Sequence, residues 1–375
     1  MRRAFVVVLD ACGVGALPDA DAYGDVGTHT LAHVAEGAGG LDLPVMQRLG
    51  LGSITPLAGV APATSPGVHG RLHPLGPGKD TIRGHWELMG VVAPHALPTY
   101  PEGFPPETLA ALREVWGRDL IGNAPADGLE VLERLGPEHL RTGAAIVYTS
   151  ADSVLQVAAH EEVIAPGELH AMCAAARDRV DVGRVIARPF TGRPGSFARS
   201  AERRDYALAP PARSYLQELQ DAGVAVHAVG KVDDVFAHVG IDHAHPGHDN
   251  ATALDAVGGL VRELDAGLVF ANLVDTDQLY GHRKDTVGFA AALARVDAAV
   301  GEWLTRLDPA RDLLVITADH GVDPRHSGWD HTREYVPLLA TCGSGRHDGP
   351  MADVGATCLD WLAAREASLP GTSFA

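Results

Sequence analysis

The chain has 375 residues, of which 46% are hydrophobic and 21% charged, and this balance predicts a folded globular protein rather than a disordered one. Its formal net charge of −18 argues against nucleic acid or an anionic membrane as a partner. The same charge repels phosphorylated small molecules at long range, so any phosphate site in this chain needs local cations or metal ions.

The amino-terminal segment superficially resembles a signal peptide, since two arginines precede the apolar residues 4–9. That run is shorter than the roughly 7–15 apolar residues of a secretion signal, and it ends in Asp10. No run in the chain approaches the ~20 apolar residues of a membrane span. The four cysteines have no CxxC spacing, which favours reduced thiols. We therefore expect a cytoplasmic protein.

Short apolar runs and the segments between them predict an α/β fold with a mainly parallel sheet sandwiched by helices. The predicted strands are residues 5–9, 144–148, 224–229, 268–274 and 313–317. Residues 214–222 predict a helix that ends before Gly223. A second helix is predicted by an apolar stripe at steps of three and four, formed by Phe289, Leu293, Val296, Val300, Leu304 and Leu307.

The residue composition changes between about residues 96 and 212. Prolines and glycines interrupt its first part, and strands typical of a buried sheet resume after it. We therefore expect a catalytic core domain made of residues 1–95 and 213–375, with residues 96–212 inserted as a smaller α+β domain.

Carboxylates and histidines follow three of the predicted strands, where sites form in open α/β sheets. The candidate ligands are Asp10, Asp277, His282, Asp319, His320 and His331. Asp275 also falls at a strand end. Any one of these aspartates is as readily explained as a helix cap as it is as a metal ligand, but helix capping does not readily explain the whole set. Asp and His ligands suit Zn²⁺ or Mn²⁺, and six of them suit two ions about 3.5–4 Å apart, as in phosphoryl transfer.

Two other clusters need interpretation. Residues 243–249 contain three histidines and an aspartate, but Pro246 and Gly247 predict a flexible loop, so we expect no catalytic ligands there and at most adventitious metal binding. Residues 184–204 contain six arginines, a residue type that grips phosphate with paired hydrogen bonds. At least half of these arginines are expected to form an ordinary solvated face.

The ligand set resembles the two-metal site of the alkaline phosphatase superfamily, and within it the chain is most similar to the phosphopentomutase family. The stretches that carry the closer resemblance are residues 78–90, 148–156, 183–190, 272–275, 330–337 and 353–357. The resemblance implies an alkaline-phosphatase-like core with the insert as a substrate-binding cap. It also implies interconversion of ribose or 2-deoxyribose 1-phosphate and the 5-phosphate through a phosphothreonine enzyme and a bisphosphate. Two divalent ions, expected to be Mn²⁺, and a sugar bisphosphate activator such as glucose 1,6-bisphosphate would be the cofactors.

The same resemblance implies roles for individual residues. Thr81 would carry the phosphoryl group, although a threonine between glycines is usually structural and its hydroxyl needs a metal or base to become a nucleophile. One ion would be held by Asp277, His282 and His331, the other by Asp10, Asp319, His320 and Thr81. The implied substrate contacts are Ser150, Asp152, Val154, Arg188, Arg203 and Lys231, with Arg188 and Arg203 at the distal phosphate.

The chain departs from the family pattern at two positions. Val322 stands where the pattern predicts Asn, and Arg83 stands where a smaller polar residue is expected. Neither change removes a predicted ligand, but Arg83 is close enough to Thr81 to affect substrate preference.

Three alternatives to a pentose phosphate mutase stay open on the sequence alone. A phosphatase or phosphodiesterase would use the same metals with water as the nucleophile. A metal-dependent phosphoglycerate mutase shares the core but is expected to have a serine nucleophile and a longer chain. The third alternative is a non-catalytic protein that binds metal or sugar phosphate. We expect a pentose phosphate as the partner, neither nucleic acid nor membrane, and a monomer in preference to an oligomer.

Overall fold

The computed structural model describes residues 2–150 and 153–375. The chain divides into two compact units, the first formed by Met1–His95 with Pro210–Ala375 and the second by Ala96–Ala209. Among the described residues, no helix combines the length and the apolar character that crossing a membrane requires.

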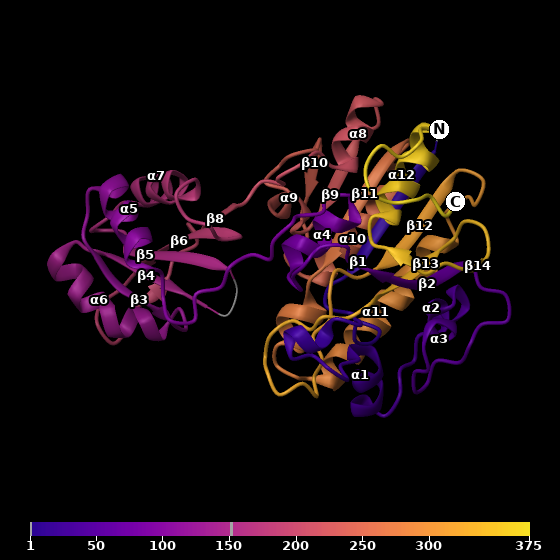
Figure 1. Ribbon diagram of the computed structural model, residues 1–375, viewed down its shortest axis with the longest axis horizontal. Helices are drawn as coiled ribbons and strands as arrows, with labels where there is room; N and C mark the ends of the chain where they lie inside the picture. Colours follow the sequence, from indigo (N-terminus) through magenta and orange to yellow (C-terminus); the bar gives the residue numbers. More distant parts are fainter. Residues whose placement is uncertain (1, 151–152) are drawn as a thin grey trace. The chain divides into compact units, whose positions relative to one another are not determined.

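The first unit is built on one large sheet (Figure 1). Its strands lie in the order β10 (His243–His245), β9 (Val226–Val229), β11 (Gly267–Leu273), β1 (Arg3–Leu9), β12 (Asp312–Thr317), β13 (Val336–Ala340), β2 (Val68–His73) and β14 (Gly345–Arg346), and β15 (Gly349–Pro350) also pairs with β2. Neighbours from β10 to β12 are parallel, whereas β13 is antiparallel to both of its neighbours. The prediction of a mainly parallel sheet is confirmed.

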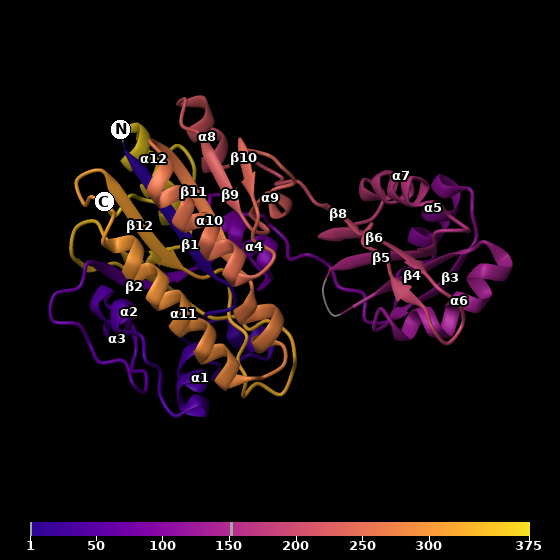
Figure 2. The same ribbon diagram turned by 180° about the vertical axis from the view of Figure 1, so that it is seen from behind.

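Helices cover both faces of this sheet, as predicted. α10 (Asn250–Glu263) and α11 (Thr286–Leu304) cross one face (Figure 2), and α8 (Tyr215–Asp221) and α12 (Asp353–Ala363) lie over the other (Figure 1). The shorter elements are α1 (Thr30–Ala38), α2 (Pro44–Leu49), α3 (Leu51–Ile54), α4 (Thr81–Leu88), α9 (Val232–Val235), a 3₁₀ turn at Ala20–Tyr23 and a π-helical turn at Thr276–Gly281.

Two predictions about these elements are wrong in part. Leu307 lies outside α11, which ends at Leu304 in a tighter turn, because Thr305 N and Arg306 N donate to the carbonyls three residues back, Glu302 and Trp303. His243–His245 form strand β10 rather than a loop. The free backbone groups on the edge of β9 pair with this segment, and that pairing overrides the local proline and glycine signal.

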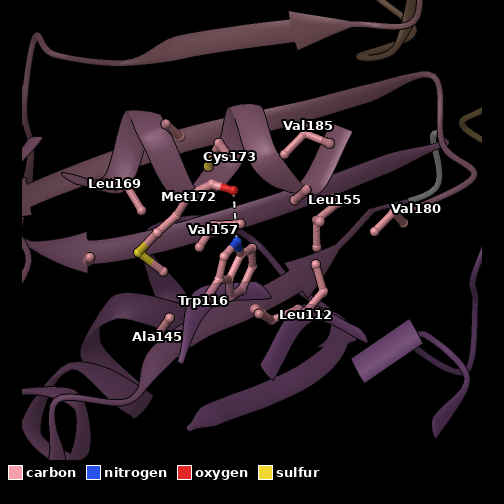
Figure 3. Close-up of a cluster of buried hydrophobic side chains, with 14 of the residues drawn as sticks. Leu112, Trp116, Ala145, Leu155, Val157, Leu169, Met172, Cys173, Val180 and Val185 are labelled. Atoms are coloured by element: carbon pink, nitrogen blue, oxygen red, sulfur yellow. Dashed lines mark hydrogen bonds between the residues drawn. The ribbon is translucent and has the colours of Figure 1, made fainter. Parts of the chain in front are cut away.

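The second unit has its own sheet and its own core. The strands are β3 (Leu120–Pro125), β4 (Ala145–Thr149), β5 (Val154–His160), β6 (Arg184–Thr191), β7 (Ala198–Arg199) and β8 (Arg204–Ala207), and the helices are α5 (Pro106–Trp116), α6 (Glu130–Thr142) and α7 (Pro166–Arg177). Figure 3 shows the apolar cluster under α5 and α7, where Trp116 Nε1 donates to the Met172 carbonyl at 2.7 Å. A second cluster, around Phe190, packs against α6.

Candidate metal centre

The register of the central strands brings distant acidic residues to one edge of the sheet. β1 pairs with β11 from Arg3↔Gly267 to Leu9↔Leu273 and with β12 up to Val8↔Thr317, so the three strands end level with one another. Asp10 follows β1, Asp277 lies in the π-helical turn after β11, and Asp319 with His320 follows β12. Their side chains therefore meet at the carboxyl edge of a buried parallel sheet.

His331 reaches the same place on a returning loop. Thr332 N donates to the Gly321 carbonyl at 2.7 Å, which ties the loop back to the end of β12. The His331 ring consequently stacks on His320 with 3.9 Å between ring centroids. All six predicted ligands come together at this edge of the first unit.

Two groups of ligand atoms form here, one of Asp277, His282 and His331 and one of Asp10, Asp277 and His320, each with its atoms within 4.8 Å of one another. In the first group, Asp277 Oδ1 is 3.3 Å from His282 Nε2 and 3.5 Å from His331 Nε2. In the second, His320 Nε2 is 3.4 Å from Asp10 Oδ1, and Asp319 Oδ2, outside the group, is 3.3 Å from the same nitrogen. Asp277 belongs to both groups, so the two groups adjoin at its carboxylate.

The chemistry of these contacts fits bound cations. Oδ1 of Asp10 and Oδ1 of Asp277 are buried and accept no hydrogen bond from the described residues, whereas Asp10 Oδ2 pairs with Lys231 and Asp319 Oδ2 with His85. His282 Nδ1 lies 2.6 Å from the Trp329 carbonyl and must donate to it, so Nε2, the nitrogen that faces Asp277, is the one available as a metal ligand. Two facing acceptors repel each other unless a cation lies between them.

The charge balance at this edge leads to the same conclusion. Lys231 is the cation that the described residues place among the three carboxylates, and it forms an ion pair with Asp10. Burial, followed by the charge of Asp319, raises the pKa of Asp10 well above its usual range. Burial also lowers the pKa of His320 to about 3, which leaves its ring neutral and able to act as a ligand. Two divalent ions would reverse the excess of negative charge and attract a phosphate dianion.

Thr81 lies directly beside this cluster, at the first position of α4. Its hydroxyl is 3.0 Å from His320 Nε2 and 3.5 Å from Lys231 Nζ. Asp80 caps the helix by accepting from Arg83 N at 3.0 Å. The positive end of the α4 dipole is therefore directed toward Thr81, where it stabilises negative charge.

Behind Thr81, His85 joins α4 to the metal edge. His85 is fully buried, and its Nδ1 is 2.9 Å from the Thr81 carbonyl and 3.2 Å from Asp319 Oδ2. Glu334 fixes the surrounding loops, because its carboxylate accepts from Gly15 N, from Thr30 N and Oγ1, and from Thr332 Oγ1. Sequence reasoning missed both residues. The helical spacing between Thr81 and His85 was the available signal for His85.

Three positions singled out in the sequence lie outside the ligand set. Asp275 does not join the ligand groups, since it exchanges hydrogen bonds with Asn250, the first residue of α10, and so tethers the start of that helix. Arg83 stacks over Trp86 at 5.2 Å and donates to the His95 carbonyl at 2.7 Å. Val322 is 2% exposed, as expected of a residue that packs rather than binds metal.

The predicted substrate contacts divide between the units. Lys231 is at the metal edge, whereas Ser150, Val154, Arg188 and Arg203 belong to the second unit, and Asp152 lies outside the described residues. Arg188 Nε donates to Gln156 at 2.7 Å, Arg203 pairs with Asp205 at 2.7 Å, and Val154 is buried.

Tyr148, which the sequence did not single out, lies near these arginines. Its hydroxyl is buried without a hydrogen-bond partner among the described residues. Burial raises the pKa of Tyr148, and the charges of Arg188 and Arg199 oppose that rise. This combination of a phenol and guanidinium groups is suited to an anion.

Comparisons with known proteins extend over the whole chain. The model of the metalloenzyme superfamily matches residues 2–366. The phosphopentomutase of Herpetosiphon aurantiacus is 48% identical and covers 100% of this chain and 98% of its own. Those of Desulfitobacterium hafniense and Caldanaerobacter subterraneus are 47% and 49% identical and cover 98% and 96% of this chain and 97% and 94% of their own. Among solved structures, the PH0037 protein of Pyrococcus horikoshii shares the fold, with a TM-score of 0.50 at 16% identity over 98% of both chains.

Proposed function

The chain belongs to the metalloenzyme superfamily and, within it, to the phosphopentomutase family, and from this membership we propose that it interconverts the 1-phosphate and the 5-phosphate of ribose or 2-deoxyribose. The observation that carries the proposal is the Thr81 hydroxyl 3.0 Å from His320, beside two ligand groups that share Asp277.

Divalent metal use is supported by the superfamily and by the ligand groups. We propose Asp277, His282 and His331 as ligands of one ion and Asp10, Asp319, His320 and Thr81 as ligands of the other. When bound, the two ions, Mn²⁺ in this proposal, neutralise charge on the transferring phosphoryl group. The three buried carboxylates of Asp10, Asp277 and Asp319, among which the described residues place the one cation Lys231, support this assignment.

Thr81 carries the phosphoryl group in the proposed reaction. Phospho-Thr81 gives its phosphoryl group to the free C1 or C5 hydroxyl of the pentose monophosphate, so the Thr81 Oγ–P bond breaks, a sugar O–P bond forms and the hydroxyl proton ends on Thr81. The resulting bisphosphate turns around, and Thr81 accepts its other phosphoryl group. Lys231 and the amino end of α4 stabilise the dianion on Thr81. Glucose 1,6-bisphosphate, or another sugar bisphosphate, would restore the phosphoryl group when it is lost.

The second unit is proposed as the cap that holds the far end of the sugar phosphate. Arg188 and Arg203 would bind the distal phosphate, with Ser150, Asp152 and Val154 beside the sugar. The unpaired Tyr148 hydroxyl near Arg188 supports an anion site in this unit. A cap of this kind keeps water from phospho-Thr81, since hydrolysis is the competing reaction.

The direct test compares Thr81→Ala, Thr81→Ser and Thr64→Ala, the last being a control at an exposed threonine. Interconversion of ribose 1-phosphate and 5-phosphate should fall to background in Thr81→Ala, persist in reduced form in Thr81→Ser, and stay unchanged in Thr64→Ala. Full activity of Thr81→Ala would refute the role of Thr81. Release of inorganic phosphate without isomerisation by the unmodified enzyme would show a phosphatase instead.

A further inference from the structure

Three histidines gather on one face of the sheet, on the two strands at its edge. His243 of β10 lies beside His227 of β9 in parallel register, and His245 follows two residues later. Side chains two residues apart on a strand project from the same face. The ring of His227 accordingly lies 4.6 Å from that of His243 and 5.2 Å from that of His245, stacked on the latter at 21°. None of the three belongs to the catalytic ligand set.

Two of the imidazoles already have the spacing of metal ligands. His227 Nδ1 and His245 Nε2 are joined by a hydrogen bond of 3.0 Å. Metal–nitrogen bonds of about 2.0–2.1 Å in a tetrahedral site place two ligand nitrogens roughly 3.3 Å apart, so the pair needs to separate by only a few tenths of an ångström. His243 is exposed, and its ring nitrogens lie more than 4.8 Å from at least one nitrogen of the pair, so its side chain must rotate to supply a third ligand.

The surroundings keep these nitrogens available. Burial, followed by the nearby His243 and His245, lowers the pKa of His227 to about 4, and burial also lowers the pKa of His245. Both rings are therefore neutral at pH 7. One nitrogen of the hydrogen-bonded pair donates to the other, so an ion can take both lone pairs only after that proton moves to the second nitrogen of its ring. Asp242 adds negative charge nearby but is not free to act as a ligand, because its two oxygens accept from Val226 N and Gln220 Nε2, each at 2.8 Å.

We propose that His227, His243 and His245 form a second metal site, which binds one transition-metal dication through three imidazoles and leaves the fourth position to water. A purely nitrogen donor set selects Zn²⁺, Ni²⁺ or Cu²⁺ over the oxygen-seeking Mg²⁺ and Ca²⁺, and binds Mn²⁺ weakly. The bound ion cross-links the short edge strand β10 to β9 and so stabilises the edge of the sheet.

The experiment counts zinc ions in the full-length enzyme after equilibrium dialysis, with elemental analysis. His227→Gln and His243→Ala are compared with the unmodified enzyme and with His248→Gln, a control in the same segment whose side chain is 79% exposed. The unmodified enzyme and His248→Gln should bind one zinc ion more than either of the other variants. All four proteins should keep the same mutase activity with Mn²⁺, because the three histidines lie outside the catalytic set.

Repeating the titration in an Asp277→Asn background separates this site from the catalytic one, since Asp277 belongs to both catalytic ligand groups. One zinc ion should still bind there, and adding His243→Ala should weaken its binding at least tenfold. His243 is exposed, so its removal does not endanger folding. Equal zinc content and affinity with and without His243 would overturn the proposal, as would loss of the extra zinc in His248→Gln.

Discussion

The imidazole of His85 has one protonation pattern that fits its surroundings. Nδ1 faces two acceptors, the Thr81 carbonyl at 2.9 Å and Asp319 Oδ2 at 3.2 Å, so Nδ1 carries the proton. Nε2 is buried without a partner among the described residues, and the ring lies 5.7 Å from that of Phe270. His85 is therefore a positioning residue, which orients the Asp319 carboxylate and holds the first turn of α4.

Two substitutions at His85 separate positioning from mere packing. Asn places an amide nitrogen near the position of Nδ1, whereas Gln places it near Nε2. We predict that His85→Asn keeps Mn²⁺ affinity within a few fold, whereas His85→Gln weakens it about 10–100-fold, as loss of a group that supports a ligand does. Calorimetric titration of the metal-free proteins measures this difference. Equal affinities of the two variants would show that the donated hydrogen bond has no role.

Most of the ligands could be predicted at the scale of single residues because they closely follow apolar strands, whereas His331 reaches the site on a returning loop. The same pattern also selected Asp275, and only the tertiary contact with Asn250 distinguishes this residue from a ligand. His85 could not be assigned from sequence alone, because its acceptor on Asp319 is distant in the chain. Its role depends on how closely α4 approaches the end of β12.

That approach is a property of α4 as an element. A Cβ atom at Gly84 would lie 2.3 Å from the Asp319 carbonyl oxygen, so the helix can reach the end of β12 only with glycine at this position. Thr81 and His85 flank Gly84 on the same helix face. The absence of a side chain at Gly84 thus sets the distance between the Thr81 hydroxyl and the metal edge.

Gly84→Ala should therefore reduce activity without removing any reacting group. The new methyl group meets backbone rather than a flexible side chain, so α4 must shift, and a displacement near 1 Å can lower the rate about 100-fold. Gly167→Ala in α7 is the control, since a Cβ there has nothing within 4 Å. The measurement is kcat for each variant at saturating substrate. A kcat of Gly84→Ala equal to that of Gly167→Ala would contradict this account of α4.

Elements were predictable where local pattern and tertiary context agree. The strand run at residues 5–9 appears within β1 because every residue of β1 is buried. β10 was missed because His243–His245 become a strand only by pairing with β9. The carboxyl end of α11 was placed too late because Leu307 continues the apolar stripe after the backbone has tightened into a turn at Thr305 and Arg306.

At the scale of the whole molecule, the net charge is −18, although a phosphopentomutase must bind anionic sugar phosphates. The first unit collects three carboxylates at the end of a buried sheet, where bound cations would reverse the local charge. The second unit has its own hydrophobic clusters on both faces of its sheet. The prolines and glycines after about residue 96 indicated an inserted domain. The sequence could not reveal that the Tyr148 hydroxyl is buried near Arg188, because that placement depends on how the strands of the second unit pair.

In our proposal the first unit binds the metal ions and the second unit binds the sugar phosphate, and this predicts the effect of removing the second unit. A chain in which Ala96–Ala209 is replaced by a short glycine-rich linker should keep its metal content, because all six ligands lie in the first unit. It should lose interconversion of pentose phosphates, and its phospho-Thr81 should hydrolyse faster. Metal analysis and the half-life of phospho-Thr81 measure these effects. Undiminished interconversion would contradict a substrate-binding role for the second unit.

The most direct test of the central claim follows the phosphoryl group itself. The enzyme is mixed with ribose 5-phosphate carrying a radiolabelled phosphate, quenched during turnover and digested, and the peptide containing Thr81 is isolated. The account predicts label on Thr81 and in a ribose bisphosphate, with no label on the peptide from Thr81→Ala. Interconversion that proceeds at full rate with no label on Thr81 at any time would contradict it.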